Sequence, residues 1–144
     1  MANQHRSERD NRSENVQQIE TDGIDLKKVT PQLFNEEAKK AAKCIAANRK
    51  SNKPTQLRRF YDEIVMWDNK TAMHPDKFDE YLPFIRMLNA KAAYAKGRNE
   101  LVDDNFLNLL AHCLQQVEEP ADMHNCKYFI EAFMGFYKGE PGIE

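Results

Sequence analysis

The 144-residue sequence has the length of one ordinary domain, with 41% hydrophobic and 31% charged residues. This balance is typical of a globular protein and excludes a fibrous or wholly disordered chain. The sequence contains no apolar run of about 18 residues that could span a bilayer, and its first residues lack the apolar stretch of a secretory signal. We therefore expect a cytoplasmic protein that does not contact a membrane.

The net charge of −2 conceals a separation of charge along the chain. Residues 26–59 contain ten Lys or Arg against two acids, and residues 86–98 add four cations without an acid. These two segments together carry +12, which leaves −14 on the remainder. The separation predicts a basic face on an acidic body, and such a face concentrates polyanions. Charge alone supports a nucleic-acid surface and a merely solvated helix face equally.

Residues 1–25 are polar, and Val16, Ile19 and Ile24 are their only large aliphatic residues. Such a segment cannot bury enough surface to order itself, so we expect a disordered or loosely ordered tail. A helical domain over residues 26–144 is expected to follow it.

Thr30-Pro31 is a typical helix start, and apolar residues at helical spacing predict a first helix that ends near Asn48. Residues 49–54 are typical of a basic loop. Thr55 is then expected to cap a second helix of about a dozen residues. Its apolar stripe consists of Leu57, Phe60, Tyr61, Ile64 and Trp67.

A break is predicted over residues 69–76, which contain Pro75, and a third helix from Phe78. Pro83 removes a backbone donor, so a kink or a new helix must lie near it. Of the two, we favour a new helix that runs to about Gly97.

An amphipathic helix is predicted from Asp103 to Glu119, and a last helix from about Asp122 to Lys138, capped by Gly139. No segment alternates with the period of a strand for long. The sequence therefore predicts an all-α protein, a compact bundle of five to six helices without a sheet.

Two short His/Cys pairs are the nearest approach to a metal site. His112-Cys113 and His124-x-Cys126 offer the nitrogen and sulfur ligands that zinc prefers. Neither pair has a common zinc-site interval, and both thiols fall on apolar stripes, so core packing is favoured. The third cysteine, Cys44, makes an odd count that favours reduced thiols. We expect no metal and no other cofactor.

No combination of residues predicts catalysis. Adjacent carboxylates such as Asp103 and Asp104 point to different sides of a helix. The five glycines form neither a phosphate-binding loop nor a nucleophile elbow. His74 has no base, nucleophile or orienting partner near it in the sequence. We therefore assign no catalytic residue and expect a protein that is not an enzyme.

A first basic cluster surrounds the start of the second predicted helix. Lys53, Arg58 and Arg59 lie where free amides and the helix dipole already favour an anion, so a phosphate there gains charge-assisted bonds. The alternative is that each arginine pairs with an acid four residues on, Arg58 with Asp62 and Arg59 with Glu63.

A second basic cluster precedes Gly97. Lys91, Tyr94 and Arg98 are spaced i, i+3 and i+7, so they lie along one edge of a helix as two cations with an aromatic ring between them. This arrangement suits a nucleic-acid backbone with a stacked base. The spacing equally supports a core tyrosine flanked by solvated cations. Lys127 and Lys138 share a further helix edge.

Three segments carry motifs of a known family. Pro54–Asp62 reads PTQLRRFYD and resembles the family segment t-x-Q-L-R-k-f-y. Met87–Arg98 reads MLNAKAAYAKGR and is similar to m-L-x-x-K-x-a-Y-a-x-x-R. Phe129–Lys138 reads FIEAFMGFYK and is similar to F-x-E-A-x-x-A-Y-h-K, with Gly135 and Phe136 where small residues or alanine are usual. In order and spacing the three resemble the small subunit of type III-A CRISPR-Cas effector (Csm) complexes.

The resemblance implies a helical, non-catalytic subunit of an antiviral defence ribonucleoprotein. Several copies would stack along the guide RNA and line the groove where target RNA pairs with it. Target cutting in that family belongs to the neighbouring backbone subunit. The implied partners are guide RNA, target RNA, the other subunits of the complex and copies of the same chain.

The expected mechanism is recognition of the RNA phosphate backbone, because guide–target pairing already supplies the sequence. The alternative is a helical protein–protein adaptor that makes no direct RNA contact. The residues expected to bind RNA are Lys53, Arg58, Arg59, Lys91, Lys96, Arg98 and Lys138.

Overall fold

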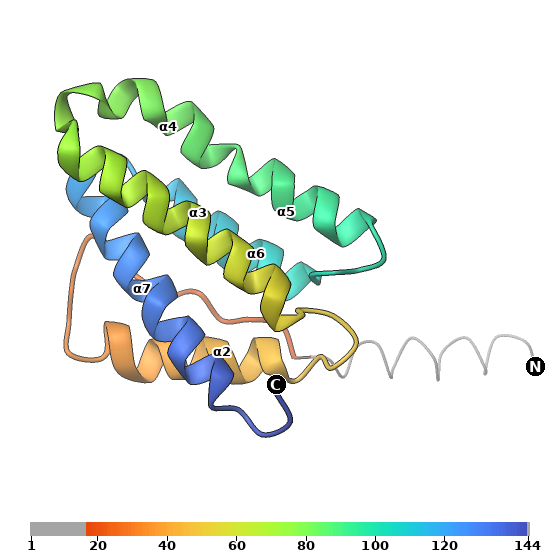
Figure 1. Cartoon of the computed structure of the whole chain (residues 1–144). Coiled ribbons are helices and arrows are strands. Elements are labelled where there is room, and N and C mark those ends of the chain that lie inside the picture. Colours follow the sequence, from red (N-terminus) through yellow and green to blue (C-terminus); the bar gives the residue numbers. More distant parts are fainter. Residues whose placement is uncertain (1–16, 144) are drawn as a thin grey trace, which may run out of the picture.

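The computed structural model describes residues 17–143, so residues 1–16 of the predicted tail lie outside it. Across residues 17–143 every regular element is helical and none is a strand, which confirms the predicted all-α class (Figure 1). No helix in this range is long and apolar enough to cross a membrane. The elements are η1 (Leu33–Glu37), α2 (Ala38–Ala46), α3 (Pro54–Met73), η2 (Pro75–Lys77), α4 (Phe78–Arg86), α5 (Leu88–Gly97), α6 (Asp104–Gln115) and α7 (Pro120–Lys138).

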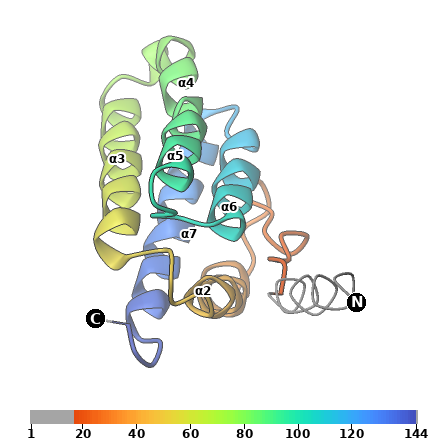
Figure 2. The same cartoon turned by 90° about the vertical axis from the view of Figure 1, so that its right-hand side faces the viewer.

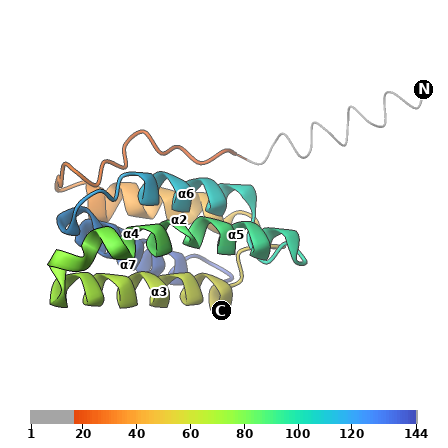
Figure 3. The ribbon, with the colours of Figure 1, turned by 90° about the horizontal axis from the view of Figure 1, so that it is seen from above.

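Helix α7 organises the bundle, because it packs along both α2 and α3. Helix α5 lies between α3 and α6 when the bundle is viewed from above (Figure 3). Helix α2 lies across one end of these helices and is seen almost end-on in Figure 2. Burial of aromatic and aliphatic side chains between these helices stabilises the bundle. The largest fully buried side chains include Tyr137, Phe129, Phe133, Leu57, Ile64 and Leu109.

Helix α3 begins earlier and ends later than the sequence predicts. Lys53 rather than Thr55 is its N-cap residue, and Pro54 occupies the first turn, where its missing N–H costs nothing. The helix continues to Met73 because Thr71 and Asp68 turn inward while the polar residues around them face solvent. It ends at His74, whose backbone the following proline keeps out of the α region.

The predicted new helix to Gly97 is present as α5, but it begins at Leu88 instead of beside Pro83, because α4 runs through Pro83 to Arg86. Pro83 lacks only the bond that its N–H would donate to Asp79, one turn earlier on an exposed helix face. The chain breaks instead at Met87, whose N–H donates to the Pro83 carbonyl at 3.1 Å. Helix α5 then ends at Gly97, as predicted.

The first and last helices also differ slightly from their predicted limits. Chain turns follow Thr30, and a π-helical turn precedes α2, which ends at Ala46. Helix α7 begins at Pro120 rather than near Asp122, because the Glu119 and Asp122 side chains form a capping box around its first turn.

Residues 17–28 form an irregular segment along α6, with turns at residues 22–23 and 26–27, here called the strap (Figure 3). The sequence assigned residues 17–25 to the tail, but the Asn105 side chain accepts a bond from Ile19 N (3.0 Å) and donates one to the Gln17 carbonyl (2.9 Å). Ile24 and Leu26 are only 2% and 0% exposed. A few apolar anchors and side chains from a distant helix order the strap, and composition does not reveal such partners.

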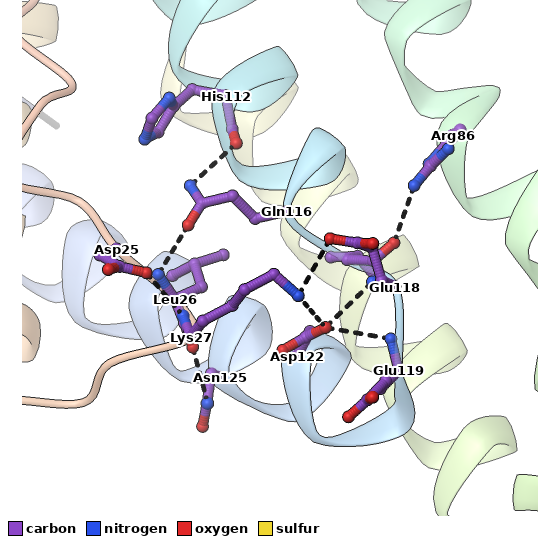
Figure 4. Close-up of polar contacts among 11 residues, drawn as sticks. Asp25, Leu26, Lys27, Arg86, His112, Gln116, Glu118, Glu119, Asp122 and Asn125 are labelled. Atoms are coloured by element: carbon purple, nitrogen blue, oxygen red, sulfur yellow. Dashed lines mark hydrogen bonds and ion pairs between the residues drawn. The ribbon is translucent and has the colours of Figure 1, made fainter.

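Polar side chains at the junction of α6 and α7 hold the end of the strap (Figure 4). The Gln116 side chain accepts a hydrogen bond from Leu26 N at 2.8 Å. The Lys27 ammonium lies 2.9 Å from Asp122 and 3.1 Å from Glu118, and its hydrogen bonds to these carboxylates raise the pKa of Lys27. The strap is therefore held against α6 and the first turn of α7.

Candidate nucleic-acid interface

Asn52 holds the end of the bundle at which the basic residues gather. It is fully buried, with a positive φ of 60° that asparagine tolerates better than most residues. Its side chain donates to the Ile45 carbonyl (3.2 Å) and accepts from Asp103 N (3.0 Å). Its backbone N–H donates to the Leu101 carbonyl (2.9 Å), and its carbonyl accepts the Tyr137 hydroxyl. One residue thus joins the ends of α2 and α7 and the α5–α6 loop at the start of α3.

Sequence reasoning missed Asn52, because it lies in what looks like an ordinary basic loop. Its one visible signal is its type, since asparagine is enriched where the backbone turns left-handed. Its partner Tyr137 is also buried, and burial raises the pKa of the Tyr137 hydroxyl to about 12. The hydroxyl therefore remains protonated near neutral pH and keeps donating to Asn52.

Arg59, Lys91 and Arg98 line one groove of about 440 Å³ between α3 and α5. In Figure 1, α3 and the α4–α5 pair diverge from the turn that joins α3 to α4. The residues that line the groove come mainly from α3 and α5. Tyr94 lines the same groove and is 69% exposed, so the reading of Tyr94 as a core residue is wrong. We call this the α3–α5 groove.

The three cations of the α3–α5 groove differ in their partners. The Lys91 ammonium lies 3.1 and 2.9 Å from the two carboxylate oxygens of Glu63. Within residues 17–143, neither Arg59 nor Arg98 forms an ion pair. The alternative pair of Arg59 with Glu63 is therefore absent from this range, because Glu63 bonds a lysine on the facing helix. Two arginines remain available to an external anion.

A second groove, of about 520 Å³, lies between the first turns of α3 and the end of α7 and is lined by Arg58 and Lys138. Arg58 Nε lies 3.2 Å from Asp62 Oδ1, which confirms the local pair, and its guanidinium lies 5.8 Å from the centre of the Tyr61 ring. Tyr61 donates to Glu131 at 3.3 Å, and burial together with that carboxylate raises the pKa of Tyr61. We call this the α3–α7 groove.

Lys53 and Lys96 lie outside both grooves. Lys53 is exposed at the N-cap of α3, beside the residues that begin the α3–α7 groove, and forms no ion pair within the described part of the chain. Lys96 is bonded to Asp104 and lines a different pocket, which also contains Glu100 and Asp103. The structure therefore places Lys96 among acids, away from the other predicted cations.

The two His/Cys pairs serve packing and hydrogen bonding. Cys113 and Cys126 are fully buried, and a hydrogen bond with Cys126, together with burial, raises the pKa of the Cys113 thiol. His112 Nε2 lies 2.7 Å from the Ile24 carbonyl of the strap, and His124 Nδ1 lies 3.2 Å from a buried carboxylate oxygen of Asp68. In residues 17–143 no three His, Cys, Asp or Glu side chains gather where they could hold a metal ion.

Comparison with family models adds an independent finding. The model of the family described as Csm2 Type III-A matches residues 28–142. Comparisons with curated proteins and with solved structures give no match. The matched range contains helices α2 to α7 and the residues that line both grooves. The chain therefore belongs to the Csm2 type III-A family and is a small subunit of the type III-A CRISPR-Cas effector complex.

Proposed function

We propose that this subunit holds RNA by its phosphate backbone and cuts nothing itself. In this proposal, several copies stack along the guide–target duplex, and residues 26–144 serve each copy as its RNA-binding domain. The observation that carries the proposal is the convergence of Arg59, Lys91 and Arg98 in one groove with an exposed Tyr94. The other subunits of the complex are its protein partners.

The α3–α5 groove suits an RNA backbone for electrostatic reasons. Each cation that neutralises a phosphate releases counterions, and about 0.7 is added to the log–log salt slope for each contact with a single strand. The guanidinium groups of Arg59 and Arg98 can each grip two phosphate oxygens. Guide–target pairing supplies the sequence, so a groove that recognises only backbone geometry suffices.

Tyr94 adds a contact that phosphate-binding lysines alone do not offer. Its ring is exposed beside the cations, and a base stacked on an aromatic side chain contributes about 1–3 kcal/mol. Because every base has a flat face, this contact is independent of sequence. Tyr94 and the three cations together fit a stretch of RNA with at least one unstacked base.

Lys53, Arg58 and Lys138 form a second, weaker set of proposed RNA contacts on the other flank of α3. Arg58 is already bonded to Asp62, but an exposed pair four residues apart on a helix contributes only a few tenths of a kcal/mol. A phosphate can therefore displace the carboxylate at small cost. Lys96 contributes least to the proposed site, because Asp104 and its acidic neighbours surround it.

The groove composition supports holding rather than cutting. Among the residues that line the α3–α5 groove, Glu63 is the one carboxylate, and it is bonded to Lys91. A general base needs a free proton-accepting position near the attacked bond. The groove offers cations and a ring, which bind charge and bases.

The experiment is a titration of the purified chain with generic single-stranded RNA at several salt concentrations. We expect affinity to fall linearly with salt on a log–log plot, to depend little on sequence, and the RNA to remain intact. A chain that co-purifies with the other complex subunits but binds no RNA at low salt would contradict the proposal and favour the adaptor alternative.

A further inference from the structure

One carboxylate lies inside the otherwise basic α3–α5 groove. Glu63 projects from α3, and both of its oxygens face the ammonium of Lys91 on α5, at 3.1 and 2.9 Å. Glu63 and Lys91 are 36% and 48% exposed, so the pair sits at the groove surface and not in the core. The ion pair therefore occupies space that a bound RNA strand would use.

We propose that Glu63 is an internal competitor of RNA phosphate, which engages Lys91 in the free chain and lowers the affinity of the groove for polyanions. The inference rests on the proposed RNA-binding function. Two carboxylate oxygens present to an ammonium nearly the same anionic face as two phosphate oxygens. Lys91 must leave Glu63, or share its charge with it, before it can neutralise a phosphate.

The exposure of the Glu63–Lys91 ion pair determines how strongly Glu63 opposes RNA binding. An ion pair at this exposure is screened by water and salt and is weak, so RNA can break it. An RNA strand that contacts Arg59 and Arg98 at the same time offsets that cost, whereas a single free phosphate does not. Glu63 thus makes the groove selective for extended polyanions.

A positioning role is the opposite reading and predicts the opposite sign. If Glu63 held Lys91 in the orientation that RNA needs, removal of its charge would weaken binding. If Glu63 competes, removal of its charge strengthens binding, because Lys91 gains a full phosphate contact. The sign of one affinity change therefore separates the two roles.

The test compares Glu63→Gln with wild type in titrations of the full chain with generic single-stranded RNA over a series of salt concentrations. We expect Glu63→Gln to steepen the salt slope by about 0.7, equivalent to about fivefold tighter binding at 0.1 M salt. Unchanged or weaker binding by Glu63→Gln, with wild type binding normally, would overturn the inference. Thermal unfolding of both proteins shows that the variant is folded.

Glu20→Gln is the matched control. It makes the same change in net charge and releases Lys40 from an exposed ion pair of 3.2 Å, away from both grooves. We expect its salt slope to equal that of wild type, and an equal gain in both variants would overturn the inference. A third variant, Arg59→Ala, distinguishes failure of the competitor role from failure of the proposed RNA site. If Arg59→Ala weakens RNA binding while Glu63→Gln has no effect, only the competitor role fails. If neither variant changes RNA binding, the proposed RNA site fails.

Discussion

Two grooves flank α3, and each is lined by one of two adjacent arginines. Arg59 lines the α3–α5 groove and Arg58 the α3–α7 groove, which is the larger of the two at about 520 Å³ against about 440 Å³. Arg58 already has a carboxylate partner and lies near an aromatic ring, whereas Arg59 has no ion pair within residues 17–143. Groove volume would favour Arg58 as the proposed anion site, whereas the partners that the two arginines already have favour Arg59.

The two grooves can also be compared by their position relative to Asn52 and by the acids near their cations. Both grooves draw residues from the first turns of α3, which follow Asn52, and Asn52 joins this end of α3 to the ends of α2 and α7 and to the start of α6. The grooves differ in the acids near their cations. In the first, Glu63 of α3 is bonded to Lys91 of α5, and in the second, Glu131 of α7 accepts a hydrogen bond from Tyr61. Substitutions of groove side chains therefore test the proposed RNA contacts while leaving Asn52 in place.

The largest expected effect is on the free energy of unfolding. Asn52→Ala leaves the Asp103 N–H without a partner, removes one of the hydrogen bonds that the Ile45 carbonyl accepts, and places alanine at a φ of 60°. An unsatisfied buried group costs about 1–3 kcal/mol and left-handed alanine about 1–2 kcal/mol. We expect a loss of about 2–5 kcal/mol in urea denaturation, with both grooves disturbed.

Asn52→Gly is the control for that measurement. Glycine adopts a positive φ without strain, so it removes the side-chain bonds alone and should cost about 1 kcal/mol less than alanine. Equal stability of wild type and both variants would show that the junction does not depend on Asn52.

The second effect concerns the α3–α5 groove as a whole. Replacement of Arg59, Lys91 and Arg98 by alanine removes two unpaired arginines and one lysine that Glu63 already engages, so the log–log salt slope of RNA binding should flatten by about 1.4–2. The control is Lys39→Ala, Lys40→Ala and Lys43→Ala on α2, which removes the same charge from residues that line neither groove. An unchanged slope in the groove variant would reject these three assignments.

The third effect tests base stacking. Tyr94→Ala should weaken binding of single-stranded RNA by about 1–3 kcal/mol with little change in salt slope, because the ring carries no charge. Tyr94→Phe keeps the stacking face and should bind like wild type. If a titration shows equal affinity for all three proteins, Tyr94 is not a stacking platform.

The smallest effect belongs to the α3–α7 groove. Arg58→Ala combined with Lys138→Ala should flatten the slope by less than the roughly 1.4 that two full single-strand contacts would give, because Asp62 already shares Arg58. Lys96→Ala should leave the slope unchanged, since Asp104 and neighbouring acids hold that lysine. A slope change in Lys96→Ala as large as in the double variant would contradict this ranking.

The sequence predicts well what depends on residues within one helix. The stripe of α3 is buried at Leu57, Phe60 and Ile64, and the expected Arg58 pair forms, because both follow from the spacing within one helix. Asp103 likewise caps α6, with its side chain accepting from Phe106 N at 2.9 Å.

The sequence does not predict what depends on a partner from another element. Glu63 could pair with Arg59 on its own helix, but the structure brings Lys91 within reach from α5. Asn105 orders the strap from 86 positions away in the sequence. Lys96 shares a segment with Lys91, yet faces acids instead of the groove. Long-range placement of this kind is fixed by packing of whole helices, which the spacing of single residues does not encode.

If the cations of the α3–α5 groove hold RNA, the two adjacent arginines of α3 should differ in their contribution to binding. Arg58→Ala and Arg59→Ala make the same chemical change on the same helix and leave the same net charge. In parallel salt titrations with single-stranded RNA, we predict that Arg59→Ala flattens the log–log slope by about 0.7 and that Arg58→Ala flattens it by clearly less. Equal slopes for the two variants, or a larger loss for Arg58→Ala, would contradict the account.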